Sequence, residues 1–198
     1  MKLIIFIKNP ILGNVKTRLA ATVGQEKALQ IYRELCAITR DLAEKSSAKC
    51  YLFYSDFIDS NDEWSPAVFE KHLQKQSNDL GERMNAAFQT VFDAHEPLTR
   101  ILIIGTDCPD ISQDLLAQAF YLLDWHDVVL GPAEDGGYYL LGLKAPTPEL
   151  FSDMVWSTST VCTETYDRAD NLGQGVERLR VLRDIDTEAD YVAWQTQL

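Results

Sequence analysis

Asp107 stands directly after an apolar run, where its carboxylate could bind a metal ion or contact a phosphate group. The four aliphatic residues 101–104 predict a strand buried on both faces, and Gly105 and Thr106 end that strand. In open α/β sheets, ligands bind in the crevice beyond the carboxyl ends of the strands, and Asp107 falls at such an end. A single aspartate can equally cap the following turn, with a helix that starts near Ser112. Asp107 alone therefore leaves both interpretations open.

Two more aspartates follow the last predicted strand. Residues 176–182 alternate in polarity, and continuing this alternation through Ile185 places Asp184 and Asp186 on the same side of the chain. Two carboxylates on one side can share a divalent cation, and oxygen ligands of this kind favour Mg²⁺ or Mn²⁺. None of the three histidines lies in these segments. The sequence therefore argues against a histidine-rich zinc site and against histidine-based nucleophilic catalysis.

The loop at residues 8–19 could hold a phosphate group. It follows a predicted buried strand at residues 2–7 and contains one glycine and three cations: Gly13, Lys8, Lys16 and Arg18. A glycine-containing loop that leads into a helix can bind phosphate through backbone N–H groups and nearby cations. The loop matches neither the Walker pattern nor G-x-G-x-x-G, so a solvated basic loop is the alternative. Arg83 lies in the first turn of a predicted helix, where it opposes the helix dipole unless it faces an anion.

A turn with two acids and two glycines, residues 134–137, follows another predicted buried strand at residues 127–131. Adjacent glycines can simply form a hairpin turn, or they can let a substrate lie against bare backbone. We favour the second interpretation because we expect the strand at 127–131 to neighbour the strand that precedes Asp107. If an acceptor hydroxyl has to be deprotonated there, Asp135 or Glu134 could act as the general base.

Length, composition and charge restrict the class of protein. The chain of 198 residues, 46% hydrophobic and 24% charged, suits one domain spanning residues 1–198. Its formal net charge of −12 argues against a nucleic-acid partner, and it requires local cations or a metal for any phosphate ligand. The four cysteines lack C-x-x-C spacing, and no apolar run suits a signal peptide or a membrane span. We therefore expect a cytoplasmic protein.

Strand-like and helix-like segments alternate along the chain, which predicts an α/β fold. The expected helices lie at about residues 25–45, 113–123 and 157–171, a further one follows residues 78–83, and a short one lies at 146–154. Asp79 with Glu82, and Thr187 with Asp190, resemble capping boxes that would start the helix after residue 79 and a terminal helix. The expected strands not yet mentioned lie at 49–54, at 68–73 on the edge of the sheet, and at 138–143.

Five segments, in order along the chain, resemble the DUF2064 family of bacterial proteins: KNPILGNVKTRL, NDLGERM, IGTDCPD, GPAEDGGYYLLGL and RDIDTEADY. Members are labelled glycosyltransferases by similarity, within the GT-A or nucleotide-diphospho-sugar transferase superfamily. The pattern is more distantly similar to cofactor guanylyltransferases. This resemblance implies a Rossmann-like, three-layer α/β/α fold with a mostly parallel, mixed sheet. Two departures are Asn78, where the family pattern has glycine, and a first loop that lacks the paired glycines of sugar nucleotidyltransferases.

The resemblance also implies roles for individual residues. It places nucleotide phosphates at Lys16 and Arg18, and the acceptor against Gly136 and Gly137. It assigns the metal to three acids: Asp107, Asp184 and Asp186. The complete expected nucleotide-binding set is Lys8, Gly13, Lys16, Arg18 and Arg83. The expected catalytic residues are Asp107, Lys16 and Asp135.

These residues together predict a transferase that depends on Mg²⁺ or Mn²⁺. The donor would be a nucleoside triphosphate or a nucleotide-sugar, the acceptor a small molecule, and the transferred group a nucleotidyl or glycosyl unit. A non-catalytic nucleotide-binding protein on the same fold is the alternative. The sequence predicts neither the nucleotide base nor the oligomeric state.

Overall fold

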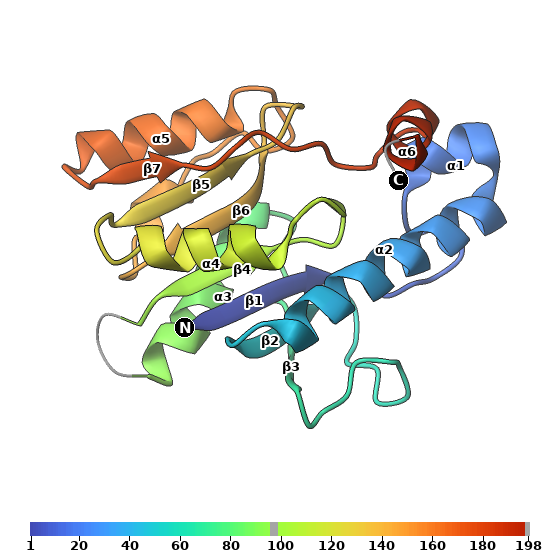
Figure 1. Cartoon of the computed structure of the whole chain (residues 1–198), viewed down its shortest axis with the longest axis horizontal. Helices are drawn as coiled ribbons and strands as arrows, with labels where there is room; N and C mark the ends of the chain where they lie inside the picture. The colour runs from blue at the N-terminus through green and yellow to red at the C-terminus, as the bar shows by residue number, and fades with distance from the viewer. Residues whose placement is uncertain (96–98, 197–198) are drawn as a thin grey trace.

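The computed structural model describes residues 1–95 and 99–196, in which seven strands form one sheet with helices on both faces (Figure 1). The sheet order is β3-β2-β1-β4-β6-β5-β7, and only β6 runs antiparallel to its neighbours β4 and β5. The strands are β1 (Lys2–Ile7), β2 (Lys49–Tyr54), β3 (Phe69–Leu73), β4 (Ile101–Ile104), β5 (Val128–Pro132), β6 (Tyr138–Leu143) and β7 (Val176–Arg178). This arrangement confirms the predicted α/β fold with a mostly parallel, mixed sheet.

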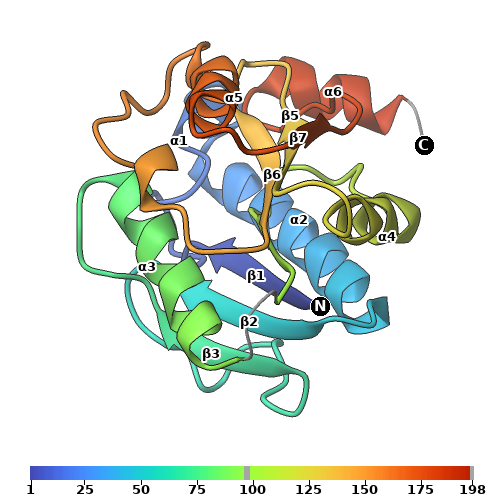
Figure 2. The same cartoon turned by 90° about the vertical axis from the view of Figure 1, so that its left-hand side faces the viewer.

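The helices cover the sheet because successive strand side chains point to opposite faces. They are α1 (Thr17–Val23), α2 (Gln25–Lys45), α3 (Leu80–Asp93), α4 (Gln113–Leu122), the 3₁₀ helix η1 (Pro148–Leu150), α5 (Val161–Asn171) and α6 (Glu188–Gln195). In β1, Leu3 and Ile5 pack with α2 and α4, whereas Ile4 packs with α3 and α5 on the other face (Figure 2). No helix in the described ranges is long and apolar enough to cross a membrane.

A third apolar cluster packs α6, near the C-terminus, against α1 and α2. Leu19 of α1 and Trp194 of α6 pack with Ile31 and Leu35 of α2, together with Ile185 (Figure 1). This packing brings the segment that precedes α6 alongside the loop that precedes α1. The acids near residue 185 and the cations near residue 17 consequently meet, although about 170 residues separate them.

Side-chain caps start three of the described helices: α3, α4 and α6. Asp79 accepts a hydrogen bond from the Glu82 amide at the start of α3, and Ser112 accepts one from the Leu115 amide at the start of α4. Thr187 and Asp190 form a reciprocal capping box that starts α6, as the sequence predicts. These caps fix the first residues of α3, α4 and α6, each of which follows a polar loop.

Four expectations about the sheet and its helices were wrong. The short helix expected at residues 146–154 is only the 3₁₀ helix η1 (Pro148–Leu150), which is followed by a turn. The strand β5 does not neighbour β4, because the β5–β6 hairpin folds back and places β6 between them. The last strand ends at Arg178, and beyond it only a single bridge, Ala133 to Leu182, continues the pairing. The helix expected from residue 157 begins at Val161, because the preceding residues form turns and Ser157 has a positive φ of 62°.

Candidate active site

A pocket of about 580 Å³ opens beyond the carboxyl ends of β1 and β4 and the amino end of β6. Because β6 is antiparallel, the residues that start it face the same sheet edge as the residues that follow β4. Nine of the residues predicted for the site line this pocket: Lys8, Lys16, Arg18, Arg83, Asp107, Asp135, Gly137, Asp184 and Asp186. The crevice expected for an open α/β sheet is therefore where these residues converge.

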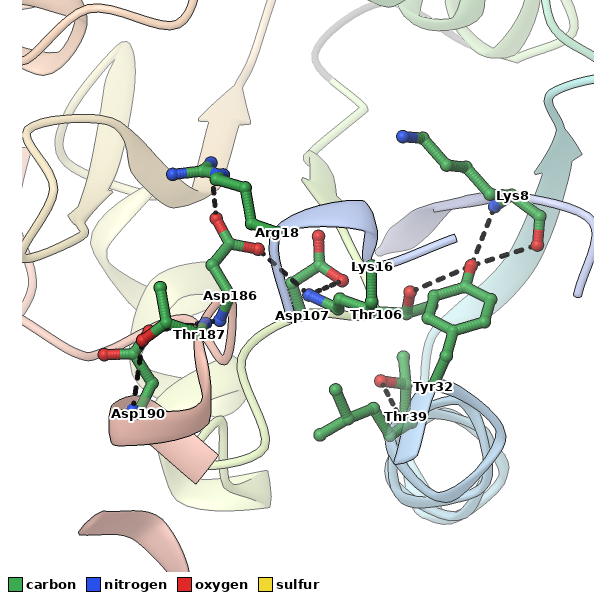
Figure 3. Close-up of polar contacts among 11 residues, drawn as sticks. Lys8, Lys16, Arg18, Tyr32, Thr39, Thr106, Asp107, Asp186, Thr187 and Asp190 are labelled. Carbon is green, nitrogen blue, oxygen red and sulfur yellow. Dashed lines mark hydrogen bonds and ion pairs between the residues drawn. The ribbon is translucent and has the colours of Figure 1, made fainter. Parts of the chain in front are cut away.

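Lys16 lies between two of the predicted metal ligands (Figure 3). Its ammonium group is 2.7 Å from Asp107 Oδ1 and 3.1 Å from Asp186 Oδ1, and its side chain is only 4% exposed. Burial lowers the pKa of this ammonium, but the two carboxylates outweigh burial and hold the pKa above its ordinary value. Arg18, which is largely exposed, donates to the other oxygen of Asp186 at 2.8 Å.

The backbone holds this cluster in place. The amide of Ile185 donates to the carbonyl of Asp107 at 2.8 Å, which ties the segment after β4 to the segment before α6. Lys16 itself is in the left-handed region, with φ 48° and ψ 46°, directly before α1. A non-glycine residue in this region is strained by about 1 kcal/mol or more, so the surrounding contacts must hold Lys16 there.

Asp184 is the most perturbed acid in the pocket. Burial, followed by repulsion from Asp107, Asp135 and Asp186, raises the pKa of its carboxyl group to about 7. Lys16 lowers the pKa of Asp184, but its ammonium group pairs with Asp107 and Asp186 rather than with Asp184. A carboxyl group with its pKa raised in this way needs a proton or a cation, and such groups are frequent at functional sites.

The two glycines of the β5–β6 turn have different surroundings. Gly137 lines the pocket, and its amide donates to Asp135 Oδ1 at 2.9 Å. Gly136 is not among the lining residues of the pocket; a Cβ there would lie 2.1 Å from the carbonyl oxygen of Ser159, and its φ is +90°. Close backbone packing therefore accounts for the glycine at position 136.

We expect Gly136→Ala to destabilise the fold by about 2–3 kcal/mol, since the new methyl group meets backbone and the positive φ adds strain. Chemical denaturation would measure the loss. Gly173→Ala is the matched control: its φ is +72°, but no atom lies within 4 Å of the new Cβ. Equal losses for the two variants would contradict the packing explanation.

The other predicted nucleotide-binding residues, Lys8, Arg83 and Gly13, lie outside the cluster of Lys16, Asp107 and Asp186. Lys8 is exposed, and its backbone amide and carbonyl both bond to the hydroxyl of Tyr32 (Figure 3). Arg83 donates to Gln74 at 3.2 Å, and its Nε is buried without a partner in the described structure. Gly13 is outside the pocket lining and provides a positive φ of 83° near Gln25.

Sequence reasoning missed several residues that shape the pocket. Tyr32 lies on the apolar stripe of α2 and looks like scaffold from its spacing, yet its hydroxyl lines the pocket and accepts a bond from Thr106. Gln74 and Trp156 also line it, and the Trp156 indole N–H is buried without a partner in the described structure. The apolar pattern of the helix indicates only that Tyr32 faces the core. No signal in the sequence indicates that Gln74 or Trp156 lines a pocket.

The sequence matches one family model, "Uncharacterized protein conserved in bacteria (DUF2064)", over residues 38–158. This match covers more than half of the chain. The chain belongs to the DUF2064 family. No curated protein matches the sequence.

Solved structures similar to this DUF2064 chain share its whole fold. One is described as a candidate nucleotide-diphospho-sugar transferase from Desulfovibrio desulfuricans G20, with 31% identity and a TM-score of 0.89 over 100% of this chain and 88% of that chain. The inositol-1-phosphate CTP transferase from T. maritima has 12% identity and a TM-score of 0.62 over 96% and 90% of the two chains. Rv0371C from Mycobacterium tuberculosis H37Rv, in complex with manganese, has 11% identity and a TM-score of 0.55 over 100% of both chains.

The acids of the DUF2064 chain suit a divalent cation by their chemistry, although they are not gathered as ligands. Among the described residues, no three His, Cys, Asp or Glu side chains lie close enough together to hold a metal ion. Asp107, Asp184 and Asp186 nevertheless face one pocket and repel one another, and their hard oxygen donors are those that Mg²⁺ and Mn²⁺ prefer. In this structure the positive charge between the Asp107 and Asp186 carboxylates is the ammonium group of Lys16.

Proposed function

We propose that this chain is a metal-dependent transferase that uses a nucleotide or nucleotide-sugar donor, within one domain spanning residues 1–198. One observation carries the proposal: a buried lysine, an exposed arginine and three aspartates converge in a pocket at the ligand-binding edge of the sheet. Cations alone would serve a binding protein. Acids that repel one another in the same pocket favour a cation-assisted reaction of a phosphate-containing donor.

We assign the chemical roles as follows. Lys16 and Arg18 contact the donor phosphates and neutralise charge on the leaving group, with Lys8 as a further cation at the rim. Asp107, Asp184 and Asp186 would hold Mg²⁺ or Mn²⁺, which when bound supplies positive charge at the phosphate oxygens. The acceptor lies near Gly137, whose backbone forms part of the pocket wall.

Nucleotidyl transfer is the version that the cations favour. A departing pyrophosphate carries more negative charge than the nucleoside diphosphate that departs in glycosyl transfer, and four cations line the pocket to receive it: Lys8, Lys16, Arg18 and Arg83. An acceptor that is already ionised, such as a phosphate or carboxylate, then needs no general base. Neighbours that use CTP, at 12% and 11% identity, share the fold and are consistent with this version.

Glycosyl transfer is the second version, and the relative at 31% identity favours it. An acceptor hydroxyl would then require a base. Asp135 lines the pocket and is the candidate, whereas Glu134 is paired with Arg183 at 2.7 Å and does not line it. We place either reaction in the cytoplasm, since Cys36, Cys50, Cys108 and Cys162 are all free and buried, which suits a reducing compartment.

A thermal-shift screen tests the proposal. CTP, GTP, UTP, ATP and their sugar-diphosphate conjugates would each be added with Mg²⁺ and with EDTA. A ligand at about a hundredfold above its Kd adds roughly 2.7 kcal/mol of stability, which raises the melting temperature of a chain of this size by roughly 5–10 °C.

The pattern of shifts discriminates between the functions. A metal-dependent shift with a free triphosphate indicates nucleotidyl transfer, and one with a sugar conjugate alone indicates glycosyl transfer. A shift that EDTA does not change, without product from any donor, indicates a non-catalytic nucleotide-binding protein. No shift with any nucleotide contradicts the proposal.

A further inference from the structure

The ammonium group of Lys16 occupies the space between Asp107 Oδ1 and Asp186 Oδ1 (Figure 3). A lysine that is only 4% exposed is costly to bury as a cation unless carboxylates pair with it, and these two carboxylates do so. The acids depend on Lys16 in turn, because it is the buried cation among them. Arg18 reaches Asp186 alone, from a position that is 73% exposed to solvent.

A divalent cation needs the same carboxylate oxygens that Lys16 now contacts. Two cations that share these oxygens at hydrogen-bond distance would repel each other in a pocket of reduced dielectric constant. Lys16 itself lines the pocket, together with Thr17 and Arg18. Because the long lysine side chain has several rotatable bonds, its ammonium group can reach a ligand in the same pocket by a change of side-chain rotamer.

The backbone around Lys16 is strained at the edge of the pocket. Lys16 is held in the left-handed region directly before α1, and Gly13, three residues earlier, has a positive φ of 83°. A left-handed backbone costs a residue with a side chain about 1 kcal/mol or more, whereas glycine adopts it readily. Strain of this kind at a pocket edge persists where the local contacts compensate for it.

We propose that Lys16 is an internal counter-ion that competes with the divalent cation for Asp107 and Asp186, and that it leaves them when the cation binds. This inference rests on the metal role in the proposed function. The displaced ammonium then faces the pocket, where the donor phosphates would lie. Each of the two ligands, donor and metal, should therefore increase the affinity for the other. The donor phosphate stabilises the Lys16 ammonium group away from Asp107 and Asp186, and the metal takes the place of this ammonium group between the two carboxylates.

The test measures binding of Mn²⁺ alone, without nucleotide, by the loss of the free-ion electron paramagnetic resonance signal. Lys16→Met removes the competing charge and is expected to bind Mn²⁺ about tenfold or more tightly than the wild type. Lys27→Met is the matched control: Lys27 lies on the exposed face of α2, contacts Gln30 at 3.4 Å, and its loss changes the net charge equally. The control should leave the Mn²⁺ affinity unchanged.

A second measurement covers the case in which Lys16→Met folds poorly. Its melting temperature in EDTA should fall below that of the wild type, because Asp107 and Asp186 lose their cation, and Mn²⁺ should restore it by more than it raises the wild type. Lys16→Arg, which keeps the charge, should behave like the wild type in both measurements.

The outcomes separate this inference from the proposed function. If the wild type binds Mn²⁺ and Lys16→Met binds it no more tightly, Lys16 does not compete, although the metal role stands. If neither protein binds Mn²⁺, the metal role fails and the competition fails with it. Equal tightening in Lys16→Met and Lys27→Met would show a general charge effect and would also overturn the inference.

Discussion

Asp107→Asn is expected to lower turnover about 100-fold or more with whichever donor shifts the melting temperature. Asp107 lines the pocket, contacts Lys16 at 2.7 Å and is one of the three acids proposed to hold the metal. Asparagine keeps the size of the side chain but removes the charge that a divalent cation requires. A 100-fold loss corresponds to about 2.7 kcal/mol of transition-state stabilisation, which is typical for one electrostatic contact in an active site.

Asp110→Asn is the control for this prediction. Asp110 follows the same strand three residues later, and its carboxylate does not line the pocket. Its replacement removes an equal charge and should change turnover less than about twofold. Initial rates for both variants, each with saturating Mg²⁺ and with EDTA, provide the comparison. Turnover of Asp107→Asn at the level of Asp110→Asn would remove Asp107 from the proposed metal site.

The elements whose signal is local were predictable from the sequence. The strands at 2–7, 49–54 and 138–143 and the helix at 25–45 have the predicted bounds. Each combines a continuous or periodic apolar pattern with a clear end signal, so nearest neighbours in the sequence determine it. Asp79, Ser112 and Thr187 also cap helices as predicted, because a cap depends on only three or four consecutive residues.

The order of the strands was not predictable in the same way. The buried runs of β4, β5 and β6 are all mainly apolar, and nothing in their patterns indicates which two strands pair with each other. The hairpin turn at 134–137 makes β6 return beside β5, and β4 then pairs with β6 instead of β5. The turn nevertheless lies at the expected edge of the sheet, because an antiparallel β6 starts at the same edge at which β4 ends.

The site was predictable in its residue types but not in its contacts. Acids after strands and cations in the first loop could be read from the chain, and the fold brings them to one pocket. The direct contact of Lys16 with Asp107 and Asp186 depends on α1, α2 and α6 packing together, across about 170 residues of sequence. The packing of Gly136 against Ser159 is likewise a contact between distant residues that the sequence could not indicate, and the acceptor-binding role inferred for Gly136 stays a prediction.

Asp184→Asn is expected to stabilise the protein, increasingly so as the pH rises. The folded-state pKa of Asp184 is raised to about 7, first by burial and then by neighbouring acids, whereas an unfolded aspartate has a pKa of about 3.9. The folded state therefore binds more protons than the unfolded state in this window, and stability falls as the pH rises from about 4 to about 7. Asparagine has no charge to bury. The free energy of unfolding of Asp184→Asn, relative to that of the wild type, should therefore increase by roughly 2–3 kcal/mol between pH 5 and pH 8.

Chemical denaturation in EDTA at both pH values would measure this change. Asp127→Asn is a control of opposite sign: the Gly175 amide and Lys144 hold the pKa of Asp127 below its ordinary value. Its folded-state charge is favourable, so the stability it contributes is present above the unfolded pKa and is lost only as the pH falls below it. Asp127→Asn should thus destabilise the protein at pH 8.

If Asp184→Asn gives the same change in stability at pH 5 and pH 8, Asp184 is already ionised at pH 5. The acids of the pocket then coexist without needing a cation, and the electrostatic argument for a metal at Asp107, Asp184 and Asp186 loses its basis.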